Sequence, residues 1–133
     1  MATFTLEILT PYRQFYSGEA EALVFTIPDG EYGVQAGHAP AVTVVVPCTL
    51  RYKVNGEWRT AAVTSGMAEV MPEYTVLLVA AAEHPEEIDL SRAEAARLRA
   101  EEKLRYQGNI QDHLSAQAAL SRAMARLKTG KKI

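Results

Sequence analysis

The sequence predicts an α+β protein in two parts: an all-β sandwich or barrel over residues 1–84, followed by a helical hairpin over residues 85–133. The first part consists of short runs that alternate between apolar and polar residues, separated by Gly and Pro at intervals of about 8–12 residues, which is typical of sandwiches and barrels. The second part is dominated by Ala, Leu, Glu and Arg, which are strong helix formers.

The first strands are predicted by alternation. Residues Thr3 to Thr10 alternate strictly, so we expect a half-buried strand that Pro11 ends. Residues 12–21 are expected to form a turn and a short strand. A further alternation runs from Leu23 to Ile27 and stops at Pro28-Asp29-Gly30, which is a strong turn signal.

The later strands follow the same logic. Residues Ala41 to Val46 form an apolar run, and residues 50–54 alternate up to Asn55-Gly56, which is a hairpin signal. Residues 58–62 are the expected return strand. The run from Val76 to Ala80 is apolar throughout, and we expect a buried strand there.

The first helix is predicted from Leu90 to Gln107, a stretch without Gly or Pro. Either Asp89 or Ser91 can cap its start, because both side chains can accept a hydrogen bond from the first turn. Residues 81–87, which include Pro85, are the expected hinge between the two parts of the chain.

The second helix begins after a break at Gln107-Gly108-Asn109. Asn109 or Asp112 can start it, and the Ala-rich run from Leu114 to Leu127 continues it until Gly130, which we expect to end it. With so short a connection, the two helices should form an antiparallel hairpin.

Small residues should form the contact between the two helices: Ala93, Ala96, Ala100, Ala116, Ala119 and Ala123. Such a seam allows close approach but buries little, at about 0.8 kcal/mol per CH₂-sized group. We therefore expect a hairpin that is held weakly and can open.

Arginines gather at the open end of this hairpin. An antiparallel arrangement places Arg92 and Asp89 near Arg122 and Arg126, and Arg99 lies two turns from Arg92 on the same face. Arg122 and Arg126 are like charges four residues apart, which destabilise a helix by roughly 0.2–0.5 kcal/mol. A bound anion would relieve this repulsion; the alternative is a solvated basic face.

The charge of the chain is divided between its two parts. Residues 1–87 hold 11 acids and 4 bases (−7), residues 88–133 hold 5 acids and 10 bases (+5), and the sum is the net charge of −2. The basic part could attract a nucleotide, an acidic protein surface, a membrane surface or a nucleic acid. Nucleic acid is disfavoured, because Tyr106 is the only aromatic residue after Tyr74 and the sequence pI is about 5.9.

Other classes are excluded by what the sequence lacks. The three histidines are far apart and no nucleophile elbow is present, so we expect no catalytic activity. There is no apolar run of about 18 residues and no charged-then-apolar leader, so we expect neither a membrane span nor a secretion signal. Cys48 is the single cysteine, which excludes an internal disulfide, and it is expected to be buried in a strand.

The segment Ile88-Asp89-Leu90-Ser91-Arg92-Ala93 matches the I-D-x-x-R-A motif of the epsilon subunit of bacterial F-type ATP synthase. Arg99, Arg122 and Arg126 match the spacing in that family, and the resemblance extends over essentially the whole chain. In members that bind ATP, the motif and these arginines form a nucleotide site on the folded hairpin. The motif indicates the capacity to bind ATP and not the affinity.

The resemblance implies ATP as a regulatory ligand, with the participation of Mg²⁺ left open. It implies that Glu83 and Asp89, with the backbone of Ile88 and Ala93, face the base. The ribose and phosphates would then face four arginines, whose forked donors suit phosphate: Arg92, Arg99, Arg122 and Arg126.

Residues 31–40 read as a surface loop containing two glycines, Pro40 and His38, whose simplest role is a hydrogen bond within the loop. Together with Asp29-Gly30, however, they match the D-G-x-x-G-x-x-x-G-H-A-P motif of the same family. The resemblance implies that this loop lies against the c ring and the gamma subunit, with Glu31 and His38 as contact residues.

The resemblance thus implies an antiparallel β-sandwich of about ten strands, followed by the two-helix hairpin. It implies a non-catalytic rotor subunit of the central stalk that couples gamma to the c ring in proton-driven ATP synthesis. The hairpin would bind ATP when compact; when extended it would reach the catalytic alpha and beta subunits and inhibit ATP hydrolysis. Such a subunit would be peripheral, on the cytoplasmic face of the bacterial cell membrane. The alternative is a stand-alone anion- or nucleic-acid-binding sandwich with a basic helical tail.

Overall fold

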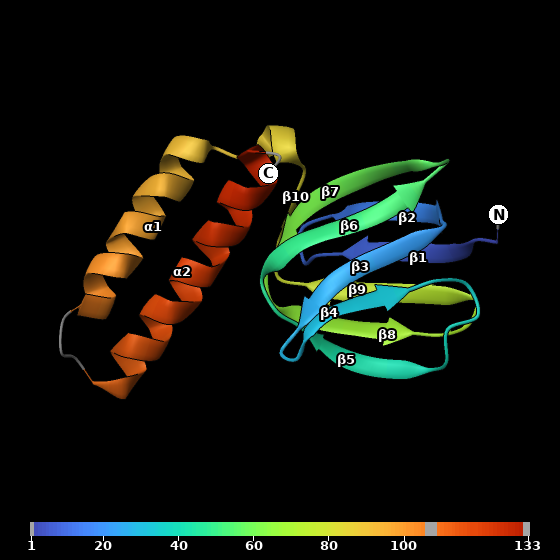
Figure 1. Ribbon diagram of the computed structural model, residues 1–133, viewed down its shortest axis with the longest axis horizontal. Helices are drawn as coiled ribbons and strands as arrows, with labels where there is room; N and C mark the ends of the chain where they lie inside the picture. Colours follow the sequence, from blue (N-terminus) through green and yellow to red (C-terminus); the bar gives the residue numbers. More distant parts are fainter. Residues whose placement is uncertain (1, 106–108, 132–133) are drawn as a thin grey trace.

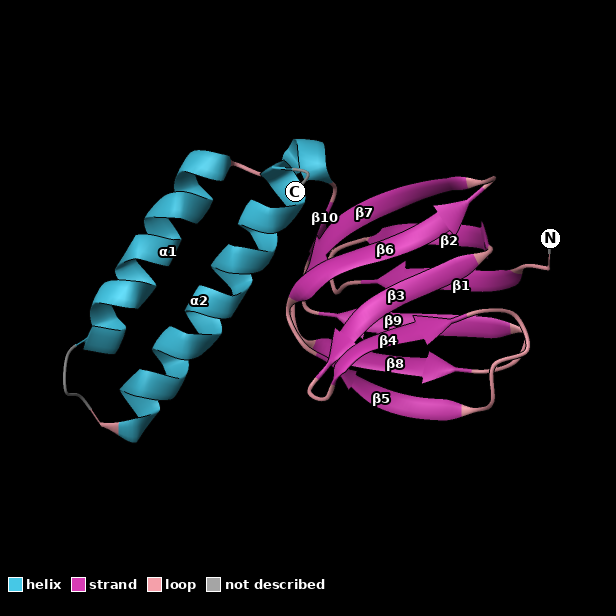
Figure 2. Cartoon of the chain, in the orientation of Figure 1, coloured by secondary structure: helices cyan, strands magenta, loops and turns pink. Residues whose placement is uncertain are grey.

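The computed structural model describes residues 2–105 and 109–131, which form a β-sandwich with a helical hairpin at one end (Figure 1). Figure 2 shows the strands gathered in the sandwich and both long helices outside it. The strands are β1 (Phe4–Leu9), β2 (Gln14–Ala20), β3 (Ala22–Ile27), β4 (Gly30–Val34), β5 (Ala41–Val45), β6 (Cys48–Val54), β7 (Glu57–Val63), β8 (Gly66–Val70), β9 (Tyr74–Val79) and β10 (Ala82–Glu83). A 3₁₀ turn, η1 (Pro85–Glu87), leads to helices α1 (Leu90–Arg105) and α2 (Ile110–Lys131).

The strands form two five-stranded sheets that face each other. Sheet A has the order β2-β1-β9-β8-β5 and sheet B the order β10-β7-β6-β3-β4. All pairs are antiparallel except β1 with β9, which are parallel. The predicted fold class, a ten-stranded sandwich followed by two packed helices, is confirmed.

The core lies between the two sheets and draws on alternate residues of their strands. Phe4, Leu6 and Ile8 are fully buried, as the alternation of the first strand predicts. Cys48 is buried at the start of β6, as predicted, and its burial raises the pKa of the thiol. Every described residue of this core falls between positions 4 and 82, so the described residues of the helices contribute nothing to it.

Part of the predicted loop at 31–40 is a strand. Residues Gly30–Val34 form β4 and pair with β3, so only the residues after Val34 are irregular. Val34 is buried, and the ring of Tyr32 packs on Phe25 with centroids 5.4 Å apart. The burial of these two alternate side chains overrides the poor strand propensity of the glycines.

The two helices begin at asparagine and aspartate caps. The Asp89 carboxylate accepts a hydrogen bond from the backbone N–H of Arg92 at 3.1 Å, so of the two predicted caps Asp89 is used. The Asn109 side chain likewise accepts from the N–H of Asp112 at 2.7 Å. Gln107 and Gly108, which we expected to form the break, lie outside the described residues.

The prediction that Gly130 ends the second helix is wrong, because α2 continues to Lys131. A Cβ at position 130 would lie 2.6 Å from Cδ2 of Leu90 and 3.4 Å from Cγ2 of Ile88. Gly130 therefore allows α2 to approach the start of α1 closely. Of the described residues, no helix is long and apolar enough to cross a membrane.

Helix α2 lies between α1 and the sandwich and packs against β6 and β7 (Figure 1). The hydroxyls of Thr49 on β6 and Thr129 on α2 are 2.7 Å apart and share a hydrogen bond. Nε of Arg126 donates to the Glu83 carboxylate on β10 at 2.5 Å. The hairpin is thus docked mainly through the last two turns of one helix.

The segment that joins the two parts is itself held by the sandwich. Arg13 donates to both carboxylate oxygens of Glu87, at 3.0 and 2.8 Å, and to the carbonyl of Ala82 at 2.9 Å. The rings of Phe15 and His84 stack with centroids 4.1 Å apart. These contacts hold residues 82–87 of the expected hinge, which was predicted at 81–87, against Arg13 and Phe15 around the start of β2.

The Arg13–Glu87 ion pair should make stability depend on acid. Hydrogen bonds from Arg13, and from the backbone of His84, lower the pKa of Glu87 from 4.5 to about 2. Because the pKa is lower in the folded protein, the stabilisation is complete above pH 4.5 and is lost as the pH falls towards 2. Since both side chains are about two-fifths exposed, we expect about 0.5–1 kcal/mol.

The variant Glu87→Gln should therefore flatten the acid limb of a plot of urea midpoint against pH between about pH 5 and pH 2. The matched control is Glu86→Gln, since Glu86 is exposed and forms no ion pair within residues 2–105 and 109–131. An acid limb of equal slope in wild type and Glu87→Gln would contradict the assignment.

Candidate nucleotide groove of the hairpin

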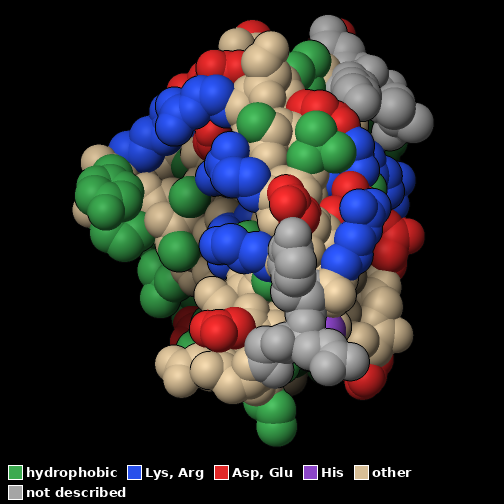
Figure 3. Space-filling view, turned by 90° about the vertical axis from the view of Figure 1, so that its left-hand side faces the viewer, with side chains coloured by type: hydrophobic (Ala, Val, Ile, Leu, Met, Phe, Trp, Pro, Cys, Tyr) green, Lys and Arg blue, Asp and Glu red, His purple; other side chains and the backbone are tan. Residues whose placement is uncertain are grey.

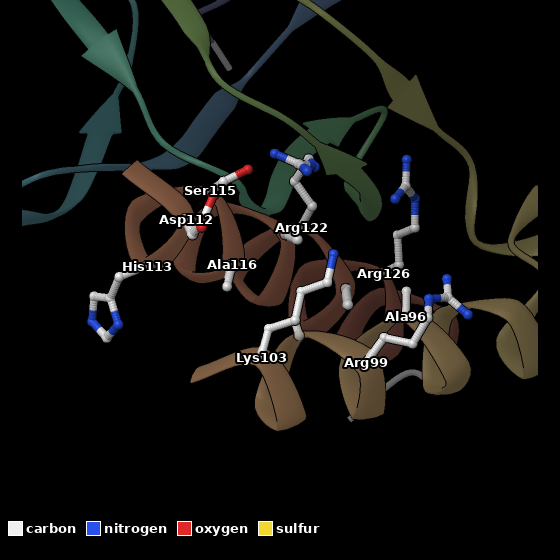
Figure 4. Close-up of a pocket in the computed structure, with 12 residues that line it drawn as sticks. Ala96, Arg99, Lys103, Asp112, His113, Ser115, Ala116, Arg122 and Arg126 are labelled. Carbon is white, nitrogen blue, oxygen red and sulfur yellow. The ribbon is translucent and has the colours of Figure 1, made fainter. Parts of the chain in front are cut away.

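A groove runs between α1 and α2 with a volume of about 690 Å³ (Figure 4). Its lining residues come from both helices: Ala96, Arg99, Ala100 and Lys103 of α1, and Asp112, His113, Ser115, Ala116, Ala119, Arg122, Ala123 and Arg126 of α2. A volume between about 300 and 1,000 Å³ is typical of sites for small ligands and cofactors.

The floor of the groove is the predicted alanine seam. Ala93 and Ala100 of α1 and Ala116 and Ala123 of α2 are buried where the helices meet, whereas Ala96 and Ala119 are half-buried. Because these side chains are short, they leave space above the seam that larger residues would fill. The groove is a direct consequence of this choice of residues.

Cations surround the groove. The side chains of Arg99 and Lys103 on α1 and of Arg122 and Arg126 on α2 extend on the same side of the hairpin (Figure 4). Asp112 carries the only carboxylate among the lining residues that the structure describes. Four positive charges against one negative charge make the groove an attractive site for an anion.

Arg126 differs from the other cations because it already has a partner, Glu83. Both side chains are about one-third exposed, so the pair is partly shielded from water. Within the described part of the chain, Arg99, Lys103 and Arg122 form no ion pair. An anion entering the groove would meet these three cations directly. To bind the fourth, Arg126, the anion must displace Glu83 or share Arg126 with it.

The predicted site residues divide into two groups. Arg99, Arg122 and Arg126 are brought together in the groove, with Glu83 bound to Arg126. The I-D-x-x-R-A residues do not line it: Asp89 caps α1, Ala93 is buried in the seam, Ile88 is half-buried and Arg92 is exposed.

Lys103 was missed as a groove residue by the sequence reasoning. The signal was available, because Lys103 follows Arg99 by four residues and therefore lies on the same face of α1. Figure 3 views the molecule from the hairpin end and shows Lys and Arg side chains in several patches with carboxylates between them. Overall basicity alone therefore does not identify the groove.

The two predicted contact residues, Glu31 and His38, lie in different elements of the structure. Glu31 lies on β4 and accepts a hydrogen bond from Arg51 at 3.1 Å. His38 lies in the following loop, where Nδ1 donates to the carbonyl of Ala39 at 2.7 Å and the ring lies 5.4 Å from that of Tyr32. The hydrogen bond of His38 within its own loop is confirmed.

The outer face of sheet A carries an apolar row that the sequence reasoning missed. The strand register aligns Val44, Met67, Leu78 and Leu9 across β5, β8, β9 and β1. Val44 and Met67 are 51% exposed and Leu78 is 57% exposed. The prediction of a buried strand at 76–80 is therefore wrong for Leu78, because only alternate residues of β9 point into the core.

Comparison with known proteins matches both parts of the chain. The family described as "ATP synthase, Delta/Epsilon chain, beta-sandwich domain" matches residues 3–85, and "ATP synthase, Delta/Epsilon chain, long alpha-helix domain" matches residues 86–131. The "ATP synthase epsilon chain" of Ruminiclostridium cellulolyticum is 51% identical over 127 residues, covering 96% of this chain and 95% of the relative. That of Caldanaerobacter subterraneus is 45% identical, with 98% and 95% covered.

Solved structures show the same fold at low sequence identity. A chain in the cryo-EM structure of the Euglena gracilis mitochondrial ATP synthase superposes with a TM-score of 0.83 at 21% identity, covering 94% of this chain and 79% of that one. A chain in the Tetrahymena thermophila mitochondrial ATP synthase gives 0.73 at 13% identity, with 97% of each chain covered. Together with the bacterial relatives, both family matches show that the chain belongs to the epsilon chain family of ATP synthase, a non-catalytic subunit of that complex.

Proposed function

We propose that the chain is a rotor subunit of the central stalk of an F-type ATP synthase, coupling gamma to the c ring in proton-driven ATP synthesis. Its hairpin switches between a compact state that binds ATP and an extended state that inhibits ATP hydrolysis. The observation that carries the proposal is the groove between α1 and α2, where cations from both helices converge over a seam of alanines.

ATP fits the chemistry of this groove. The guanidinium groups of Arg99, Arg122 and Arg126 present forked donors that match phosphate oxygens, and the repulsion between them falls when an anion enters. Phosphate binding to Arg126 releases Glu83, whose carboxylate then becomes available to the amino group of the base. In this proposal Asp89 and the backbone of Ile88 and Ala93 complete the base site.

Arg92 joins the phosphates by a change of side-chain conformation. It is exposed, and it lies two turns before Arg99 on the same face of α1. Its long side chain can therefore reach the groove without a movement of the helix.

The switch needs two states that are close in free energy and a ligand that prefers one of them. The alanine seam and the few docking contacts of α2 supply the first condition. ATP supplies the second, because it contacts both helices of the compact hairpin and stabilises that state by RT ln(1 + [ATP]/Kd). In the extended state, α2, which has no acid after Asp112, reaches the acidic surface of the alpha and beta subunits.

Calorimetric titration of the full chain with ATP, in the presence and absence of Mg²⁺, tests the proposed site. We expect saturable binding at one site. Absence of binding up to millimolar ATP would contradict the nucleotide site and leave the basic helix as a protein-contact surface only.

The sandwich is the proposed docking part, which places the subunit at the cytoplasmic face of the bacterial membrane through the complex. The apolar row of sheet A offers gamma a face with the character of an interface core, and Glu31 and His38 are the proposed contacts with the c ring. The double variant Val44→Glu/Leu78→Glu should fold but fail to assemble with gamma in a pull-down. Ser65→Glu, at an exposed turn, is the control; normal assembly of the double variant would exclude this face.

Deletion of residues 88–133 should leave a folded sandwich that still assembles with gamma, because the core contains no residue of the hairpin. The assembled complex should then hydrolyse ATP faster, since the inhibitory helix is absent. Circular dichroism and an ATPase assay measure the two effects. A fragment that fails to fold would contradict the division of the chain into residues 1–84 and 85–133.

A further inference from the structure

An exposed tryptophan lies on strand β7, beside two cations of β6 and away from the groove of the hairpin. Trp58 is 51% exposed, with Cζ of Arg51 at 5.8 Å and Nζ of Lys53 at 5.9 Å from its ring centroid. Residues 1–87 contain 4 bases, and three of them, Arg51, Lys53 and Arg59, are on these two strands.

The edge of β7 beside this tryptophan is open. Strand β10 pairs with β7 only at Ala62 and Val63, so residues 57–61 have no strand neighbour on that side within the described residues. Figure 1 shows β10 as a short strand at one end of β7, with the rest of β7 at the margin of the sheet. An open edge offers backbone N–H and C=O groups to an additional strand.

A groove of about 630 Å³ runs along this edge. Trp58, Arg59 and Thr60 line it from β7, His84 lines it from the segment after β10, and Lys128 and Thr129 line it from α2. Among the described residues that line it, Glu86 is the only one with a carboxylate. Arg51 is paired with Glu31, but no ion pair involves Lys53, Arg59 or Lys128 in the described part of the chain.

We propose that the edge of β7 around Trp58 is a docking surface for an acidic, extended segment of a partner protein. The segment would continue the position of β10 and form backbone hydrogen bonds with residues 57–61. Because successive side chains of a strand point to opposite faces of a sheet, the apolar side chains of the segment would lie on the face of Trp58, and its carboxylates would lie on the opposite face, where they would meet Arg59. Trp and Arg are enriched at the centres of protein interfaces. This proposal does not depend on ATP binding.

The test uses the full chain and a dye-labelled twelve-residue peptide in which Glu alternates with Val. Trp58 is the single tryptophan, so its fluorescence reports directly on this surface. We expect saturable binding by fluorescence anisotropy, a shift of the tryptophan emission, and no binding of the same peptide with Lys in place of Glu. N-methylation of alternate residues on one edge of the peptide should abolish binding, because it removes the backbone donors of that edge.

Variants separate this surface from general charge attraction. Trp58→Ala should weaken binding about tenfold, and Arg59→Gln several-fold, while Arg105→Gln, an exposed charge on α1, should leave it unchanged. Equal binding of the Glu and Lys peptides, or equal affinity of wild type and Trp58→Ala, would overturn the proposal. It would also be overturned by a tryptophan shift with vesicles of anionic phospholipid and none with the acidic peptide, since the surface would then bind a membrane.

Discussion

Replacing Arg122 and Arg126 together by alanine should lower the affinity for ATP by about 100-fold or more. Both side chains line the groove of the hairpin, and each hydrogen bond to a charged group is worth roughly 1.5–3 kcal/mol, so two lost contacts give roughly 3–6 kcal/mol. Calorimetric titration of the variant beside the wild type measures the change. The electrostatic attraction between the extended helix and the catalytic subunits should fall as well.

Two further variants serve as controls for the double alanine variant. Arg122→Lys with Arg126→Lys keeps the charge but loses the fork, so its affinity should lie between those of wild type and the alanine variant. Arg105→Ala removes an arginine of α1 that does not line the groove, and it should leave ATP binding unchanged. Full ATP affinity and full inhibition of hydrolysis in the double alanine variant would show that the site is not where we propose.

The variant Gly66→Ala should destabilise the sandwich by about 3 kcal/mol or more, as overpacking in a rigid core does. Gly66 lies on β8 between β5 and β9. A Cβ at this position would lie 2.0 Å from the carbonyl oxygen of Leu78 and 2.7 Å from Cα of Val79. Both are backbone atoms of a central strand, so relief requires the sheet to move. Urea denaturation of the full chain measures the loss.

The matched control is Gly33→Ala on β4, where an added Cβ has no atom within 4 Å. A change of less than about 0.5 kcal/mol is expected there, as for other surface substitutions. If the two variants had the same urea midpoint, the close packing of Gly66 against β9 would not be present in solution.

The strongly patterned elements could be predicted from the sequence. The strict alternation of β1 and the uninterrupted helix formers of α1 both appear as expected, because local preference and burial agree there. β4 could not be predicted, because its glycines are typical of a loop. The strand is stabilised by the packing of Tyr32 and Val34 against the core, which the local sequence does not reveal. The role of Gly130 was also predicted wrongly. Glycine often ends a helix, but here it lies inside α2, where its lack of a side chain makes room for Leu90.

The candidate site was predictable only in part. Arg99, Arg122 and Arg126 share a groove because their spacing puts them on facing sides of an antiparallel hairpin, and spacing can be read from the sequence. The ion pair of Arg126 with Glu83 joins residues 43 positions apart and depends on where β10 leaves the sheet. Contacts between distant elements of this kind are set by the tertiary fold.

The stability of the two parts is correspondingly unequal. The sandwich has a continuous core of large side chains, whereas the two helices meet through a seam of alanines. Among the described contacts, α2 docks on the sandwich through buried Leu127, the Arg126–Glu83 ion pair and the hydroxyl of Thr49. Elements with few buried apolar contacts open at the lowest free-energy cost. In the proposed switch, this inequality would allow the hairpin to change state while the sandwich stays docked.

The most direct test of the switch is the distance between the two parts, measured by electron spin resonance with and without ATP. Spin labels would be placed at Ser17→Cys on β2 and Ile110→Cys at the start of α2, both exposed, with Cys48→Ala removing the native thiol. Without ATP we predict a compact and a longer-distance population, and with saturating ATP the compact population alone. The same distance distribution in both conditions, with ATP bound, would contradict the proposal that ATP controls the hairpin.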